Sequence, residues 1–265
     1  MKAAELHAHM QKVGTWVDWS RANDKFLVGD PETEVHGIAV GWMPTAGALD
    51  EARRRGANVF VTHEPLYVSD PDPAKSVGPD HPWVRKKAWL DKTGMVVYRC
   101  HDVWDDFPEI GIHGAWAQWL GFAGKPLAMQ KWYEVHPTEE TTLGGLARRI
   151  LKKVRPLGQD VVHLVGDPET KVSRIALGTG AITNYAVMRG MGADCLLLTD
   201  DGTRLWESAQ WSFESGIPLL LVNHATAEEP GMMTLVEYLA EQFPEVLVHH
   251  IPVGCLYRTV GGGTA

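Results

Sequence analysis

The sequence predicts an α/β protein made of two similar lobes that arise from an internal repeat. The turn and strand at residues 29–41 recur at 166–178, where nine of the thirteen positions are identical. Short apolar runs bounded by turn residues precede His63, His101 and His224. Such runs are typical of buried strands in a mostly parallel sheet. Self-similarity over a long period indicates that each copy forms its own strand–helix–strand unit.

The first copy reads as alternating helices and strands. An amphipathic helix is expected over residues 2–15, and a strand follows at 38–42. Gly56 and Gly94 are placed to end helices. The remaining predicted elements are a helix at 46–55, a strand up to His63, a loop at 71–82, a helix at 84–92, a strand up to His101 and a helix at 112–120.

The second copy repeats this order after a joining segment at 126–165. In that segment we expect a helix over 140–154, capped by a threonine, and a strand at 161–165. The copy itself is expected to contain a strand at 175–178, a helix at 181–189, a strand ending near Asp200, a helix at 208–215 and a strand up to His224. Residues 178–181 form a glycine turn that could hold an anion, although a simple turn is the plainer interpretation. We divide the chain into lobes at 1–125 and 126–265.

Composition and charge narrow the class of protein. The chain has 265 residues, a net charge of −8 and 45% hydrophobic residues, so it can bury a sizeable core. Without a basic stripe we expect no nucleic acid partner. No signal-like or membrane-length apolar stretch stands out, so we expect a cytoplasmic chain without membrane contact. The three cysteines form no CxxC pair and suit a reducing compartment.

The histidines at the strand ends each have a carboxylate close by in the sequence. His101 precedes Asp105 by four residues, and His224 precedes Glu228 by the same spacing, while Glu64 directly follows His63. One histidine after a strand is usually a cap or a hydrogen-bonded loop residue, but the repeat register favours ligands. Imidazole and carboxylate groups suit divalent ions such as zinc, iron or manganese.

If the lobes face each other, the ligands from both copies would converge on one site. In the second copy the counterpart of the His63-Glu64 pair is Asp200-Asp201, which could approach the same site or support its ligands. Carboxylates can bridge two ions, so we expect two divalent metal ions. No lysine or arginine in the sequence pairs clearly with this motif.

At these residues the chain resembles the Nif-three-like family, also described as GTP cyclohydrolase I type 2-like proteins. The family's strand ending in His-His-Pro matches His63-Glu64-Pro65, with Glu64 in place of the second histidine. Its later motifs match His101 with Asp105 and His224 with Glu228. The resemblance implies two α/β lobes with a dinuclear metal cleft and assembly as a homo-oligomer, often a ring of six.

The resemblance also implies a metal-dependent hydrolase acting on an unidentified small molecule, loosely a purine nucleotide. A hydroxide bridging two ions would be the nucleophile, and Glu64 or Asp102 would be the general base if it is free of metal. The alternative is a metal-binding regulatory or adaptor protein without turnover. The sequence does not decide between these hypotheses, because a dinuclear site suits both.

Overall fold

The computed structural model describes residues 1–67, 77–122, 124–181 and 183–260, and these residues form two compact units. The first unit contains residues 1–107 and 232–253, and the second contains 108–231 and 254–265. The division therefore falls near residue 107 rather than at the predicted boundary after 125, and a C-terminal segment returns to the first unit. We describe each unit by itself.

The first unit is built on a five-stranded sheet in the order β1-β4-β3-β2-β11. Strand β1 pairs antiparallel with β4, whereas the other neighbours are parallel. Its strands are β1 (Lys25–Val28), β2 (Gly37–Gly41), β3 (Val59–Thr62), β4 (Val96–Arg99) and β11 (Leu247–His250). Its helices are α1 (Ala3–Val13), α2 (Ala46–Arg54), α4 (Pro82–Thr93) and α5 (Asp102–Asp105), together with the end of α10 (His224–Gln242).

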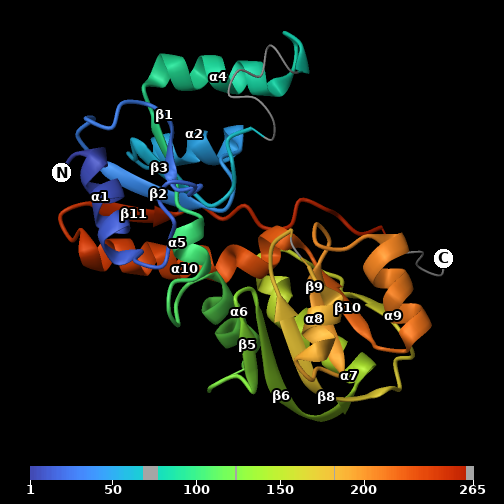
Figure 1. The fold of residues 1–265 in the computed structure, drawn as a ribbon. Coiled ribbons are helices and arrows are strands. Elements are labelled where there is room, and N and C mark those ends of the chain that lie inside the picture. The colour runs from blue at the N-terminus through green and yellow to red at the C-terminus, as the bar shows by residue number, and fades with distance from the viewer. Residues whose placement is uncertain (68–76, 123, 182, 261–265) are drawn as a thin grey trace. The chain divides into compact units, whose positions relative to one another are not determined.

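Helices cover both faces of this sheet (Figure 1). On one face, α2 and α4 pack through Leu49 and Leu90 onto Phe60 and neighbouring strand residues. On the other face, α1 is tied to the sheet by a 3.1 Å contact between His7 Nδ1 and the Tyr98 hydroxyl. The central strands β2, β3 and β4 are consequently buried, which explains why they are continuous apolar runs in the sequence.

The second unit is built on a six-stranded sheet in the order β5-β6-β8-β9-β10-β7. Strands β8, β9 and β10 are parallel, and the flanking strands are antiparallel. Its strands are β5 (Ala128–Gln130), β6 (Tyr133–Thr142), β7 (His163–Val165), β8 (Lys171–Gly178), β9 (Cys195–Thr199) and β10 (Leu219–Val222). Its helices are α6 (Ile112–Leu120), α7 (Leu143–Val154), the short η1 (Arg155–Leu157), α8 (Tyr185–Gly190), the π-helix η2 (Leu205–Ala209), α9 (Gln210–Ser215) and the start of α10.

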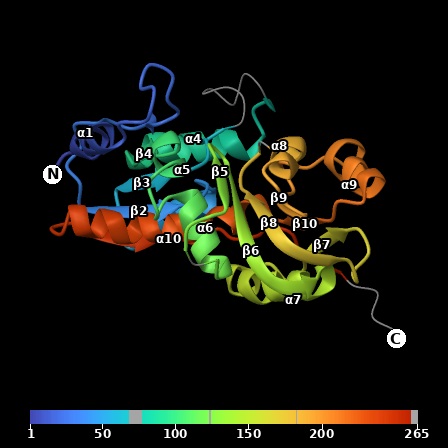
Figure 2. The same cartoon turned by 60° about the horizontal axis from the view of Figure 1, so that its bottom comes forward.

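This sheet also lies between two helical layers (Figure 2). Alternate residues of β8 point to opposite faces, as the pleat of a strand requires. Ile175 and Leu177 belong to the cluster that includes α6 and α7, whereas Ala176 belongs to the cluster that includes Met188 of α8. The second unit is therefore a three-layer α/β structure.

Local signals located most of these elements. The threonine cap of the joining helix is Thr142, whose side chain accepts a hydrogen bond from Gly145 N. Gly94 and Gly216 take the left-handed conformation at the ends of α4 and α9, with φ of 67° and 69°. This conformation costs glycine little because it has no Cβ. The mixed α/β fold with two sheets is thus confirmed, while superposition of the two sequence copies stays a prediction.

Some boundaries differ from the expectation. Helix α8 begins at Tyr185 rather than at residue 181, because Asn184 caps it by accepting a hydrogen bond from Val187 N. The glycine turn at 178–181 therefore does not lead directly into that helix. Most of the predicted loop at 71–82 lies outside the described residues. In the described part of the chain, no helix is both long and apolar enough to cross a membrane.

Candidate metal centre

In the first unit, two neighbouring parallel strands bring two histidines together. Strand β3 ends at Thr62 and β4 ends at Arg99, and these two residues face each other in the parallel register. His63 and His101 follow the strand ends and stack, with ring centroids 4.3 Å apart and an interplanar angle of 11°. Parallel strands thus deliver both imidazoles to the carboxyl edge of the sheet, where α/β proteins build their sites.

Asp105 joins these two rings. It ends the short helix α5, one turn after His101. Its Oδ1 lies 3.4 Å from His63 Nε2, and its Oδ2 lies 3.2 Å from His101 Nδ1. Asp105, which the sequence paired with His101, therefore contacts His63 as well.

Asp102 orients the His101 ring. Its Oδ1 lies 2.8 Å from His101 Nδ1, and the main chain and side-chain amide of Asn23 donate to its two oxygens at 2.9 and 3.0 Å. Burial raises the pKa of Asp102, but the hydrogen bonds from His101 and Asn23 outweigh it and hold the pKa well below its usual range. A carboxylate held in this way stays ionised and fixes the tautomer of the ring.

Asp24 supports the same loop from beneath. It is buried, and its carboxylate accepts hydrogen bonds from His101 N at 3.0 Å and Asp102 N at 2.7 Å. Burial raises the pKa of Asp24, and the backbone donors oppose this. Sequence reasoning missed Asn23 and Asp24, which belong to no repeated motif and stand far from His101 in the chain.

Arg99 also reaches this group, although the sequence indicated no lysine or arginine beside the motif. Its Nε donates to the His63 carbonyl oxygen at 2.8 Å, and its Nη2 lies 3.6 Å from Glu64 Oε2. The candidate ligands of the first unit therefore have a cation next to them.

The second unit holds a second histidine–carboxylate pair. His224 begins α10, and Glu228 lies one helical turn later with Oε1 3.1 Å from His224 Nε2. Both residues are buried. Asp201 Oδ2 lies 2.9 Å from His224 Nδ1, and Asp200 Oδ1 accepts a hydrogen bond from His224 N at 2.9 Å. The two aspartates thus support His224, as one of the sequence interpretations allowed.

Gly180 lies next to this pair. Gly180 has a φ of 72°, and a Cβ built there would lie 3.5 Å from Glu228 Oε1 and 3.8 Å from His224 Nε2. These distances are ordinary van der Waals contacts, so the positive φ rather than crowding favours glycine at this position.

The donor set suits a divalent cation. His63, Glu64 and His101 offer ligand atoms that lie within 4.8 Å of one another, and so do His101, Asp102 and Asp105. Imidazole nitrogen and carboxylate oxygen are the ligands expected for zinc, iron or manganese. The structure therefore places the four predicted ligands of the first unit together, and it pairs the two of the second unit. That both sets share one centre stays a prediction.

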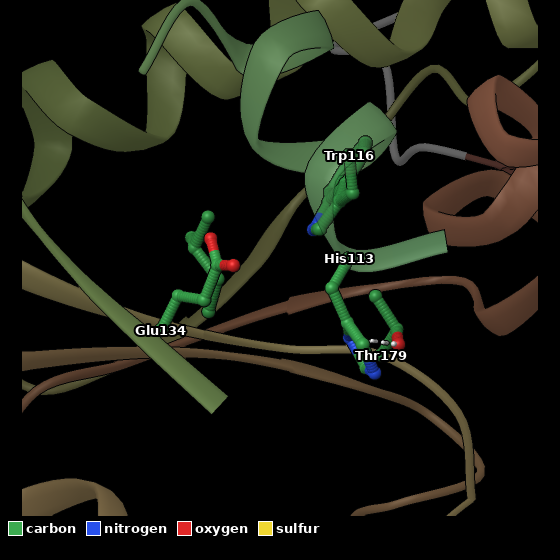
Figure 3. Close-up of a pocket in the computed structure, with 5 residues that line it drawn as sticks. His113, Trp116, Glu134 and Thr179 are labelled. Atoms are coloured by element: carbon green, nitrogen blue, oxygen red, sulfur yellow. Dashed lines mark hydrogen bonds between the residues drawn. The ribbon is translucent and has the colours of Figure 1, made fainter. Parts of the chain in front are cut away.

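A narrow pocket in the second unit lies between α6 and the sheet (Figure 3). It is lined by His113, Trp116, Glu134, Leu177 and Thr179. The Thr179 hydroxyl lies 3.3 Å from His113 Nδ1. Among the described residues, His113 Nε2 and Trp116 Nε1 are buried without a hydrogen-bond partner. This pocket thus adjoins the end of β8, which leads to Gly180.

Comparison with known proteins agrees with this architecture. The model of the family described as Duf34/NIF3 (NGG1p interacting factor 3) matches residues 5–254. A Clostridium perfringens protein named "GTP cyclohydrolase 1 type 2 homolog" is 26% identical over 230 residues, covering 83% of this chain and 84% of the relative.

Two solved structures share the fold. Staphylococcus aureus hypothetical protein SA1388 aligns with a TM-score of 0.81 at 19% identity, over 98% of this chain and 99% of that one. A Bacillus cereus protein related to NIF3 aligns with a TM-score of 0.81 at 15% identity, over the same shares of each chain.

Proposed function

The chain belongs to the Duf34/NIF3 family, and from this premise we propose that it binds divalent metal ions and acts as a metal-dependent hydrolase. One observation carries the proposal. In each unit one strand-end histidine has its Nδ1 held by a carboxylate, with His101 against Asp102 and His224 against Asp201. Metal-binding histidines usually have such an outer partner, because it fixes the tautomer and makes the ring a better ligand.

The metal ligands in this proposal come from both units. They are His63, Glu64, His101, Asp105, His224 and Glu228. We propose two divalent ions, zinc, iron or manganese, because this set contains three carboxylates and carboxylates can bridge ions. When bound, such ions lower the pKa of water and polarise a scissile carbonyl, phosphoryl or ring C–N bond.

The chain's own residues have separate tasks in this proposal. Asp102 and Asp201 orient the ligand rings. Glu64 is the candidate general base in a form of the site that leaves it free of metal, because a carboxylate beside the cations is within reach of water there. Asp102 is the second candidate for the base. Its hydrogen bonds to His101 and Asn23, and its low pKa, favour the orienting task over proton transfer.

The proposed substrate is a purine nucleotide or another small phosphorylated or amide compound. The Clostridium perfringens relative is named for a GTP cyclohydrolase, so purine nucleotides are the first compounds to test. Phosphoesters and small amides follow, because the same metal chemistry would serve them.

The test is a metal-loaded activity screen of the wild type beside the Asp105→Asn and Glu228→Gln variants. We expect turnover that depends on metal and disappears in both variants. Asp30→Asn is a matched control, because Asp30 lies in an exposed turn where it accepts a hydrogen bond from Glu32 N. Activity that persists in both site variants would come from a contaminant and would refute the assignment.

A second candidate function is a metal-binding regulatory or adaptor protein without turnover. The contact between His224 and Glu228 supports this candidate, because both residues are buried. A metal ion held there would serve storage or a structural role as well as catalysis. Tight metal binding with no activity against any compound in the screen would favour this candidate.

We also propose that the chain forms a homo-oligomer. A ring of six copies is the first assembly to test. Large apolar side chains stand exposed on the second unit, with Leu205, Trp206 and Phe213 each more than 70% accessible. Exposed apolar side chains of this size are common at protein interfaces. Light scattering that gives the monomer mass across the working concentration range would remove the proposal.

A further inference from the structure

Arg99 occupies a central position at the ligand-bearing edge of the first unit. It is the last residue of β4, and its neighbours in the sheet are Thr62 of β3 and Lys25 of β1. Its side chain is 13% exposed. The guanidinium is thus largely buried beside the loops that follow the strands.

Hydrogen bonds fix the guanidinium on two sides. Nε donates to the His63 carbonyl oxygen at 2.8 Å, and Nη1 donates to Asn23 Oδ1 at 3.1 Å. Asn23 is itself held by two hydrogen bonds to Asp102. Since the guanidinium is planar, anchoring Nε and Nη1 determines where Nη2 points.

The third nitrogen faces Glu64. Nη2 lies 3.6 Å from Glu64 Oε2, and the Glu64 side chain is 17% exposed. Glu64 also offers a ligand atom within 4.8 Å of those of His63 and His101. We infer that Arg99 is a positioning residue of the candidate metal centre, and that it orients the Glu64 carboxylate for a cation held with His63 and His101. This inference rests on the metal binding proposed above.

Removing Arg99 changes metal affinity in opposite directions for the two possible roles, positioning of Glu64 and electrostatic repulsion of the metal ion. A positive charge near the site repels a metal ion, so charge alone predicts that removal of Arg99 tightens metal binding. Orientation of a ligand predicts the opposite, because loss of an outer partner usually weakens metal affinity about 10- to 100-fold. Lysine keeps the charge but lacks the planar fork, so it restores only part of the effect.

The experiment measures Mn²⁺ affinity of the full-length, metal-stripped protein by titration calorimetry. Arg99→Gln should weaken binding about tenfold or more, and Arg99→Lys should fall between this variant and the wild type. In the Glu64→Gln background, Arg99→Gln should change the affinity less than about twofold, since the two residues act as a unit. Arg54→Gln removes an exposed arginine paired with Asp50 on α2 and is the matched control.

The possible results distinguish failure of the inference on Arg99 from failure of the proposed metal binding. Tighter or unchanged binding in Arg99→Gln overturns the inference, and so does an equal loss in both backgrounds, which would mean a general structural role. If the wild type itself binds no Mn²⁺, Zn²⁺ or Fe²⁺, the proposed function fails first. Thermal unfolding checks that Arg99→Gln is folded, and Arg99→Lys carries the test if it is not.

Discussion

Replacing Asp24 with alanine removes the support beneath the His101 loop. The buried carboxylate accepts hydrogen bonds from His101 N and Asp102 N at 3.0 and 2.7 Å, and a longer one from Val103 N at 3.4 Å. A hydrogen bond to a charged group contributes about 1.5 to 3 kcal/mol, so the two shorter bonds contribute roughly 3 to 6 kcal/mol. Burial opposes the charged form and raises the pKa of Asp24. Alanine, however, leaves the buried His101 N and Asp102 N without their acceptor, so we expect a net loss of about 2 to 4 kcal/mol.

Thermal unfolding followed by circular dichroism measures this loss. For a chain of this size, about 2 to 4 kcal/mol corresponds to a fall in Tm of roughly 5 to 15 °C. The matched control is Asp30→Ala, because Asp30 also accepts a backbone hydrogen bond, from Glu32 N, but in an exposed turn. That control should change stability by less than about 0.5 kcal/mol.

The same variant should also weaken metal binding, because Asp24 holds the main chain of a candidate ligand. Asp200→Ala tests the equivalent support in the second unit, where Asp200 accepts from His224 N. A loss below about 1 kcal/mol in Asp24→Ala would show that the loop keeps its conformation without the carboxylate, and it would refute the reasoning.

Further predictions concern metal content, a helix cap and pH. His101→Ala and His224→Ala should each lower bound metal, measured by elemental analysis, more than His249→Ala, and equal effects would contradict the ligand assignment. Thr142→Ala should lower the free energy of unfolding by about 1 kcal/mol in urea, because it removes the N-cap of α7, and no change would mean that water replaces it. Burial lowers the pKa of Lys86 from 10.5 to about 8. Between about pH 8 and 10.5 the unfolded chain therefore binds more protons at this group, so the stability of the wild type relative to Lys86→Met should rise with pH. A constant difference across this range would argue against that shift.

The sequence located the elements whose signals are local. The turn glycines Gly94 and Gly216 and the Thr142 cap act within a few residues, so their roles can be read without the fold. The strand ends that carry His63 and His101 were equally clear, because a buried strand is a continuous apolar run. Parallel pairing then places such ends side by side.

The residues that support the site, Asn23, Asp24 and Arg99, could not be predicted from such local signals. Asp24 and His101 are 77 positions apart in the chain, and Arg99 and Asn23 are 76 apart. Strand β1, which follows Asp24, joins β4 antiparallel and so returns this segment to the ligand edge. The sequence pattern of the repeat does not predict the pairing of β1 with β4.

The sequence by itself thus determined the α/β class and the helix ends and predicted the kinds of metal ligand, because periodicity, caps and donor chemistry are properties of short segments. The tertiary structure decided which carboxylate holds which ring, and it placed Arg99 beside Glu64. Those choices depend on strand order and on contacts between distant segments, which form when the sheet assembles and brings their polar groups within hydrogen-bonding distance.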